Sequence, residues 1–146
     1  MELLPIKESI EENGGFAADA RCAPTLQMSV DFYKRVGFEP PWICYYASED
    51  GEPVGDAAYK GPPKDGMVEI AYGTFEDLRG RGIGTRICSE LVKVALEADP
   101  SVRITARTLP EPNHSTRILE KNGFTLLGMV DDAEDGEVWE WEYKKA

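Results

Sequence analysis

The sequence predicts an α+β fold built on a mixed, mostly antiparallel sheet. Strand-like runs separated by turn residues occur as pairs at residues 42–60 and near the C-terminus, which is typical of antiparallel hairpins. Between these pairs lies a strand–helix–strand run, which predicts a parallel βαβ crossover. With 146 residues the chain is long enough to bury its own core, so residues 1–146 are expected to form a single domain.

The N-terminal part, from Leu3 to about Pro41, is expected to form a short opening strand or coil and then a helix. Residues 25–36 carry apolar side chains at a 3.6-residue period, and Gly37 ends the pattern. The apolar positions are Leu26, Val30, Tyr33 and Val36. Because two prolines follow at Pro40 and Pro41, the chain must leave the helix in an extended form.

Three strands are expected next. Residues 42–48 (WICYYAS) and 53–60 (PVGDAAYK) flank an Asp-Gly turn, which predicts a hairpin. After the loop GPPKDG, residues 67–75 (MVEIAYGTF) form the third strand. Gly73 interrupts this strand, and we expect it to mark a β-bulge.

The central helix is expected from Ile83 to Ala98, ended by the pair Asp99–Pro100. Its apolar stripe consists of Ile87, Leu91, Ala95 and Ala98. In the next strand, residues 101–109, Arg103 and Arg107 lie on one face. The other face carries Val102, Ile104, Ala106 and Thr108.

A second helix is expected from Asn113 to Asn122, closed by Gly123, and a hairpin of FTLLGMV and EVWEWEY follows. The hairpin is expected to point Trp139, Trp141 and Tyr143 toward the core. The acidic run at residues 131–142 (DDAEDGEVWEWE) is interpreted as a solvated turn followed by an outward strand face. Attraction of a cationic acceptor is the alternative interpretation.

Charge and composition narrow the function classes. A net charge of −11 argues against nucleic acid as a partner, because phosphate backbones require a basic face. No apolar run approaches the length of a membrane span and the start lacks a secretion pattern, so a cytoplasmic protein without a membrane partner is expected. Cys22, Cys44 and Cys88 are odd in number and far apart, which favours buried, reduced thiols over disulfides or a metal site.

The most distinctive stretch is LRGRGIGTR at residues 78–86, which lies between a predicted strand and a predicted helix. The first amides of a helix lack partners and the helix dipole is positive there, so this turn predicts an anion site. Glycines at 80, 82 and 84 allow a ligand close to the backbone, and arginines at 79, 81 and 86 add charge-assisted contacts to phosphate.

Two familiar nucleotide motifs fit poorly. A P-loop requires Lys-Ser or Lys-Thr after the glycines, and neither pair is present. For a dinucleotide fingerprint starting at Gly80, the third glycine position falls on Thr85, and no acidic ribose partner occurs before Glu111. Binding of a nucleotide without an acyl group is therefore kept only as an alternative function of this anion site.

The pattern Arg79-x-x-Gly82-x-Gly84 at a helix start resembles the acetyl-CoA pyrophosphate motif of the GNAT N-acetyltransferases. The segment NHSTRILEKNGF (residues 113–124) is similar to the branch that contains ribosomal-protein N-terminal acetyltransferases and their small-amine relatives. The resemblance covers about Val54 to Tyr143, and it implies a GNAT-like fold with a central βαβ acyl-CoA-binding unit and a closing C-terminal hairpin.

The resemblance implies that acetyl-CoA lies where the third and fourth strands splay and that a primary amine attacks its thioester directly. Pantetheine would pair with the backbone of Tyr72, Gly73 and Thr74, and the amide of Thr74 or Phe75 would bind the oxyanion. The pyrophosphate would lie on the amides of Arg79, Gly80, Arg81, Gly82, Ile83, Gly84 and Thr85. The acceptor is a small amine or a peptide N-terminus, no metal is implied, and a homodimer is compatible with the family.

Two side chains are candidates for proton transfer. Glu69 is the candidate base; alternatively it is only an exposed carboxylate on a strand. Ser115 is the candidate acid; alternatively it only caps the helix. The family's usual tyrosine acid is replaced by Leu119, and Asn113, displaced from the family's asparagine position, either contacts the cofactor or caps the helix. His114 is interpreted as a helix-start residue. A catalytically weak acyl-CoA sensor remains the competing function.

Overall fold

Seven strands form one sheet in the order β1-β2-β3-β4-β5-β7-β6, and the computed structural model describes residues 1–144 of the chain. The strands are β1 (Glu2–Pro5), β2 (Cys44–Glu49), β3 (Glu52–Tyr59), β4 (Met67–Thr74), β5 (Arg103–Thr108), β6 (Phe124–Asp132) and β7 (Gly136–Tyr143). The helices are α1 (Gly14–Ala17), α2 (Ala23–Val36), α3 (Ile83–Ala98) and α4 (His114–Lys121), with short 3-10 turns at Glu11–Asn13 and Glu76–Leu78.

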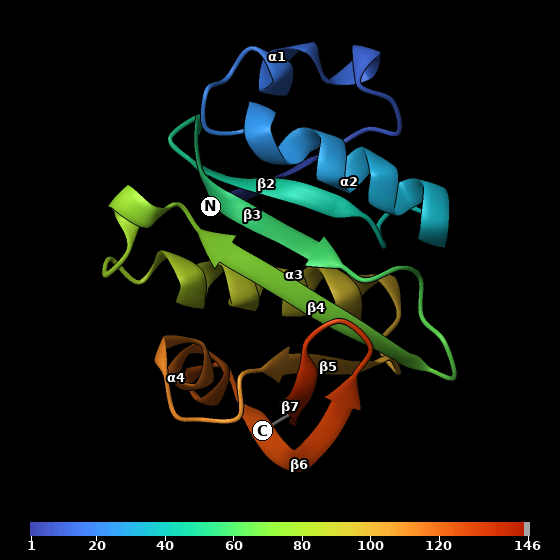
Figure 1. Ribbon diagram of the computed structural model, residues 1–146, viewed down its shortest axis with the longest axis vertical. Coiled ribbons are helices and arrows are strands. Elements are labelled where there is room, and N and C mark those ends of the chain that lie inside the picture. Colours follow the sequence, from blue (N-terminus) through green and yellow to red (C-terminus); the bar gives the residue numbers. More distant parts are fainter. Residues whose placement is uncertain (145–146) are drawn as a thin grey trace.

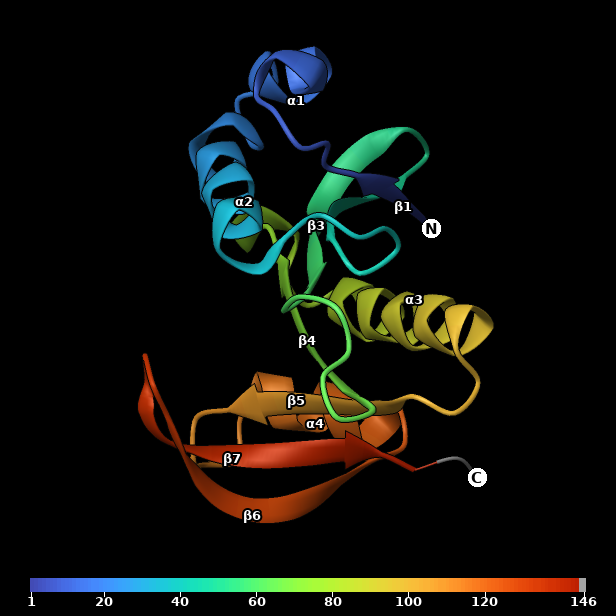
Figure 2. The same cartoon turned by 90° about the vertical axis from the view of Figure 1, so that its right-hand side faces the viewer.

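The long helices α2 and α3 cover opposite faces of the sheet, as Figure 2 shows. Helix α3 buries its predicted stripe through Ile87, Leu91 and Ala95 against β3 and β4, whereas Ala98 at its last turn is exposed. Helix α2 buries Leu26 on the other side. No helix within residues 1–144 has both the length and the apolar character needed to cross a bilayer.

The predicted βαβ unit is confirmed, because β4 and β5 are parallel and α3 connects them. Their pairing runs only from Met67–Arg103 to Ile70–Ala106, although β4 continues to Thr74. Beyond Ile70 the two strands diverge, and in Figure 1 they open toward the end of the sheet where α4 lies. The sheet therefore contains a splay between its two central strands.

Two details of the strands differ from the sequence expectation. The β3–β4 register is regular through Asp56–Gly73 and Gly55–Thr74, so the predicted bulge at Gly73 is wrong. A Cβ at Gly73 would come 3.2 Å from Oδ1 of Asp56, so this glycine makes room for a neighbouring carboxylate. In the closing hairpin Trp141 is buried as predicted, but Trp139 and Tyr143 are only half-buried at the edge of the core.

The prediction of buried, unpaired thiols is confirmed for Cys22, Cys44 and Cys88. Burial raises the pKa of Cys22 to about 11 and that of Cys88 to about 12, so both thiols are neutral at physiological pH. They are packing residues of the core.

Tyr33 fastens α2 to the sheet through its buried hydroxyl group. The hydroxyl donates to the carbonyl of Ile6 at 2.7 Å and accepts from the amide of Cys44 at 2.9 Å. We predict that Tyr33→Phe lowers the free energy of unfolding by about 2 kcal/mol, because it leaves buried backbone groups without a partner. Urea unfolding measures the change in the free energy of unfolding. Tyr143→Phe is the control, because Tyr143 is only half-buried at the edge of the core. An equal loss of stability in both variants would contradict a special role for the buried Tyr33 hydroxyl.

Candidate active site

The glycine-rich turn presents an open helix N-terminus. Gly80 and Gly82 have left-handed backbone conformations, with φ of 82° and 74°, and Gly82 caps α3 without any side-chain hydrogen bond. The first amide of this turn to reach a helix carbonyl is that of Arg86, which donates to Gly82 at 3.2 Å. The preceding amides of the first turn therefore point outward as donors for an anion.

The arginines of this turn differ in their pairing. Arg86 donates from Nε to Oε1 of Glu49 at 2.6 Å, so its charge is already neutralised by the protein. Arg79 and Arg81 are exposed and form no ion pair within residues 1–144. Two unpaired cations beside a helix N-terminus, in a chain of net charge −11, favour an anionic ligand.

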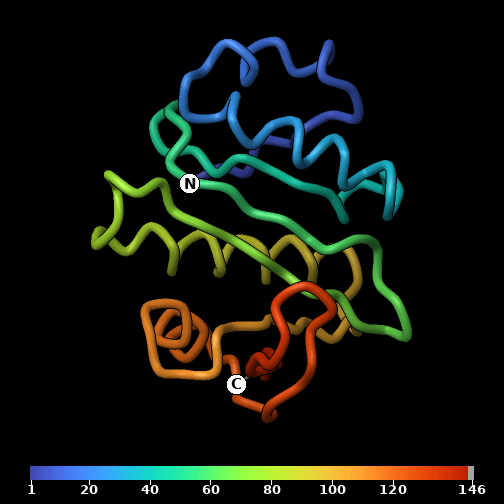
Figure 3. The backbone as a smooth tube through the Cα atoms, in the orientation of Figure 1, coloured from blue at the N-terminus to red at the C-terminus, as the bar shows by residue number. Residues whose placement is uncertain are grey.

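The turn and the splay open on the same side of the molecule, as the trace in Figure 3 shows. Along β4, the backbone groups of every second residue face the same neighbouring strand. The amide of Phe75 donates to the carbonyl of Val54 on β3, so the odd-numbered residues here face β3. The backbone groups of Tyr72 and Thr74 therefore face the side of β5, where pairing has ended. They are free to pair with an extended ligand.

A cavity of about 100 Å³ lies at the splay between β4, β5 and α4. It is lined by Ile70, Ala71, Tyr72, Ala106, Arg107, Thr108, Ser115 and Leu119. The sequence-predicted residues Tyr72 and Ser115 are thus brought together at one site. Phe75 does not fit the role of oxyanion donor, because its amide is engaged at 3.0 Å by the carbonyl of Val54, which leaves the amide of Thr74.

The start of α4 separates two of the sequence candidates. Asn113 is the N-cap, since its Oδ1 accepts from the amide of Thr116 at 3.0 Å while the Thr116 hydroxyl accepts from the amide of Asn113 at 2.9 Å. Asn113 therefore caps the helix, and its contact to the cofactor stays a prediction, whereas Ser115 lines the splay. His114 is the exposed first residue of the helix, as expected.

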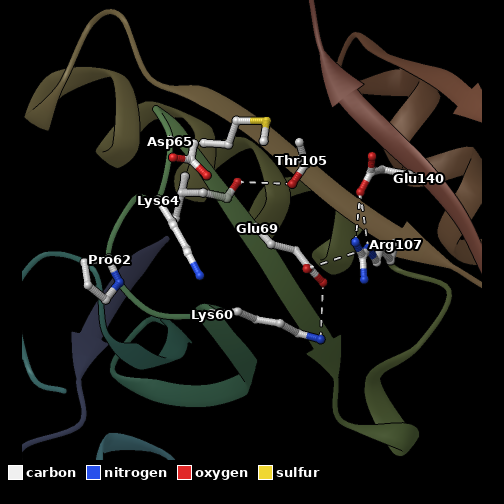
Figure 4. Close-up of a pocket in the computed structure, with 10 residues that line it drawn as sticks. Lys60, Pro62, Lys64, Asp65, Glu69, Thr105, Arg107 and Glu140 are labelled. Carbon is white, nitrogen blue, oxygen red and sulfur yellow. Dashed lines mark hydrogen bonds and ion pairs between the residues drawn. The ribbon is translucent and has the colours of Figure 1, made fainter. Parts of the chain in front are cut away.

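Glu69 lies outside the splay cavity, on the open face of the sheet. It is half-buried and ion-paired to Lys60 at 3.2 Å, and Nε of Arg107 lies 3.9 Å from its Oε1. Figure 4 shows the carboxylate between these two cations in a pocket of about 400 Å³. Glu69 is therefore a paired carboxylate that borders the site through Arg107, which lines both cavities.

The acidic run of the closing hairpin is only partly solvated, contrary to expectation. Glu142 is buried and forms a bidentate pair with Arg103 at 2.6 and 3.0 Å, and this pair lowers the pKa of Glu142. Asp132 accepts from the amide of Glu134 and from Arg107, which brings its pKa to about 2. The acids of β6 and β7 therefore neutralise the arginines of β5 across the sheet.

One carboxylate that sequence reasoning missed is Asp56 on β3. It lies opposite Gly73, is half-buried, and has no cation or hydrogen-bond donor within the described part of the chain. Burial raises its pKa above that of an ordinary aspartate. The sequence signal for it is an acidic residue in the otherwise apolar strand VGDAAY, but only the register of β3 on β4 shows what it faces.

Comparison with known proteins agrees with this architecture. Residues 16–125 match the family described as "Acetyltransferase (GNAT) domain". The chain therefore belongs to the GNAT acetyltransferase family, and the resemblance seen in the sequence is confirmed. Within residues 1–144, no group of three or more His, Cys, Asp and Glu side chains is placed to hold a metal ion.

Similar proteins include curated and solved relatives. The uncharacterized N-acetyltransferase YjdG of Bacillus subtilis (strain 168) is 34% identical over 91 residues, which are 62% of this chain and 53% of that protein. The match thus spans about half the length of that relative. The aminoglycoside acetyltransferase AAC(6')-Ib in complex with coenzyme A is 27% identical, with a TM-score of 0.61 over 70% of this chain and 66% of that one.

A third relative shows likeness of fold. The ribosomal-protein-alanine N-acetyltransferase from Brucella melitensis is 19% identical, with a TM-score of 0.62 over 92% of this chain and 90% of that chain. Together these structures confirm the predicted α+β architecture, with its mostly antiparallel sheet and central βαβ unit.

Proposed function

We propose that this protein is an acetyl-CoA-dependent N-acetyltransferase that acts on a primary amine. One observation carries the proposal: the helix N-terminus with its unpaired arginines and the splay with its free backbone groups open on the same side of one sheet. This combination suits a ligand with an anionic head and a long amide-containing arm, which is the shape of a CoA thioester. Family membership and the CoA-bound relative support it.

The cofactor would extend from the turn into the splay. The amides from Arg79 to Thr85 would hold the pyrophosphate, and the arginines at 79 and 81 would add charge-assisted hydrogen bonds. The pantetheine arm would pair with the edge of β4 beyond Ile70, and its thioester would lie near Thr74 and Ser115. In the transition state the amide of Thr74 would donate to the oxyanion.

The chemistry requires a base and an acid. An acceptor ammonium must lose a proton before its nitrogen attacks the thioester carbon, and the departing CoA thiolate must gain one. Ser115, which lines the splay, would donate a hydrogen bond or proton to the thiolate. Glu69 would act as the base through water, because it is paired to Lys60 and lies beside the cavity and not in it.

The acceptor class is a small amine or a peptide N-terminus. These are the acceptors named for an aminoglycoside acetyltransferase and a ribosomal-protein-alanine acetyltransferase among the similar structures. The competing function, an acyl-CoA sensor without catalysis, receives no support from the comparisons.

The test is turnover with a panel of primary amines: tyramine, spermidine, kanamycin and a peptide with a free serine N-terminus. We expect release of CoA thiol, matched by N-acetylated product, with at least one of them. Ser115→Ala and Glu69→Gln should each reduce kcat by about 10-fold to 100-fold while CoA binding persists. Binding without turnover of any amine would favour the sensor, and unchanged turnover in Glu69→Gln would remove Glu69 from the mechanism.

A further inference from the structure

A groove crosses the face of the sheet beneath α2 and leads to Asp56. Its larger part, about 460 Å³, lies between α2, the floor of the sheet and the β6–β7 turn, which Figure 2 shows on the same side as α2. A smaller pocket of about 200 Å³ continues from it and is lined by Asp56. The two share Met28, Ser29, Cys44 and Ala58 as lining residues.

The floor of this groove consists of small side chains. Cys44, Ala58 and Ala71 are register neighbours on β2, β3 and β4, and the next row contains Asp56 opposite Gly73. Since position 73 has no side chain, β4 places nothing there between the Asp56 carboxylate and the open edge at Thr74. A molecule lying in the groove could reach that edge directly.

Asp56 makes no contact that explains a structural role. It accepts no hydrogen bond and forms no ion pair within residues 1–144, although it is half-buried. A partly buried carboxylate without a partner lowers stability, because desolvation disfavours its charge. Unpaired groups of this kind concentrate at sites where a ligand supplies the missing partner.

We propose that Asp56 binds the ammonium group of the acceptor and takes its proton, so that the free amine attacks the thioester at Thr74. This role of Asp56 rests on the acetyl transfer proposed above. The nitrogen forms a bond to the carbonyl carbon and the carbon–sulfur bond breaks. One proton passes directly to Asp56 and from there through water, where Glu69 would assist its release to solvent. The second nitrogen proton passes to the leaving thiolate, with Ser115 as donor or relay, to give CoA thiol. The acceptors of the site are therefore cationic primary amines, which the charge of Asp56 selects over neutral nucleophiles.

The buried thiols and phenols around Asp56 are neutral near physiological pH. From β2, burial raises the pKa of Cys44 and Tyr46 above their ordinary values and that of Tyr45 to about 12; Cys22 at the start of α2 reaches about 11. From β4, Gly73 and Ala71 face the groove. Charged side chains line its larger part: Asp31 and Arg35 from α2, Lys60 after β3 and Glu134 from the β6–β7 turn. Asp19, before α2, is close enough to raise the pKa of Cys22 and Tyr46. Because the other charged groups are unchanged in Asp56→Asn, the part of the acidic limb that this variant loses should report Asp56.

The experiment compares Asp56→Asn and Asp56→Glu with Glu52→Gln, an exposed acid on the same strand. We expect Asp56→Asn to lower kcat/KM for the best amine about 100-fold or more and to abolish the rise of activity with pH as the carboxylate ionises. Asp56→Glu should recover part of the activity, and Glu52→Gln should behave as wild type. Activity of Asp56→Asn within threefold of wild type would overturn the inference.

Stability separates catalysis from structure. Because the folded pKa of Asp56 is raised, its contribution to stability is present below the ordinary aspartate pKa and is lost as pH rises through the folded value. Asp56→Asn should therefore melt at a higher temperature than wild type at pH 7.5, whereas loss of a structural residue would lower the melting temperature.

A binding measurement makes the inference independent of the natural acceptor. With CoA bound, n-butylamine should bind to the wild-type protein and shift the NMR signal of the Asp56 carboxyl carbon. The neutral analogue 1-butanol should not bind or shift that signal. Asp56→Asn should weaken the binding of n-butylamine at least 10-fold. Equal affinity of the wild type and Asp56→Asn for n-butylamine, or no binding of n-butylamine to either, would overturn the inference. Failure of CoA itself to bind would instead defeat the proposed function.

Discussion

Gly55→Ala is expected to lower the free energy of unfolding by about 3 kcal/mol. Gly55 is buried on β3, and a Cβ there would overlap the carbonyl oxygen of Gly73 and come within 2.9 Å of Cδ1 of Ile87. The carbonyl belongs to the backbone of β4, so the strands would have to separate. Thermal unfolding should show a decrease of about 6–12 °C.

Gly15→Ala is the matched control, because no atom lies within 4 Å of the added Cβ and the residue is exposed in α1. We expect it to be neutral or slightly stabilising. The clash argument would be contradicted if Gly55→Ala melted within 2 °C of wild type. Since Gly55 pairs with Thr74, a folded Gly55→Ala protein should also bind CoA less tightly.

The second large effect concerns the cofactor. The double variant Arg79→Ala/Arg81→Ala should weaken CoA binding about 100-fold, or about 2.7 kcal/mol, because it removes two charge-assisted contacts to phosphate. Both side chains are exposed and unpaired within the described residues, so folding should be unaffected. Isothermal titration calorimetry provides the dissociation constants.

Arg35→Ala serves as the control for total charge. Arg35 stacks over Phe32 on α2, outside the glycine-rich turn, and its removal should leave CoA affinity unchanged. The wild-type affinity should fall with salt more steeply than that of the double variant. Equal affinities of the wild type and the double variant would remove the arginines from the proposed site.

Local patterns predicted the elements well where several signals agreed. The bounds of α3 are those expected from its apolar period, the glycines before it and the pair Asp99–Pro100 after it. The faces of β5 were also predicted correctly, because strict alternation of apolar residues with Arg103 and Arg107 fixes which side is buried. Both features depend on residues that are neighbours in the sequence.

The errors arose where the outcome depends on pairing between distant strands. A glycine in a strand marks either a bulge or a close approach, and Gly73 is the second because Asp56 lies opposite it. The acidic run was expected to face solvent because the order β5-β7 that places it beside Arg103 and Arg107 is not visible in the sequence. Asp56 itself was overlooked for the same reason.

Thermal unfolding with and without ligand tests the central claim most directly. At about 100 times their dissociation constants, CoA and acetyl-CoA should each add about 2.7 kcal/mol to the free energy of unfolding and raise the midpoint by about 5–10 °C. NAD at the same concentration should have no effect. A shift with NAD, or none with either CoA form, would contradict the assignment of the glycine-rich turn and the splay to acetyl-CoA.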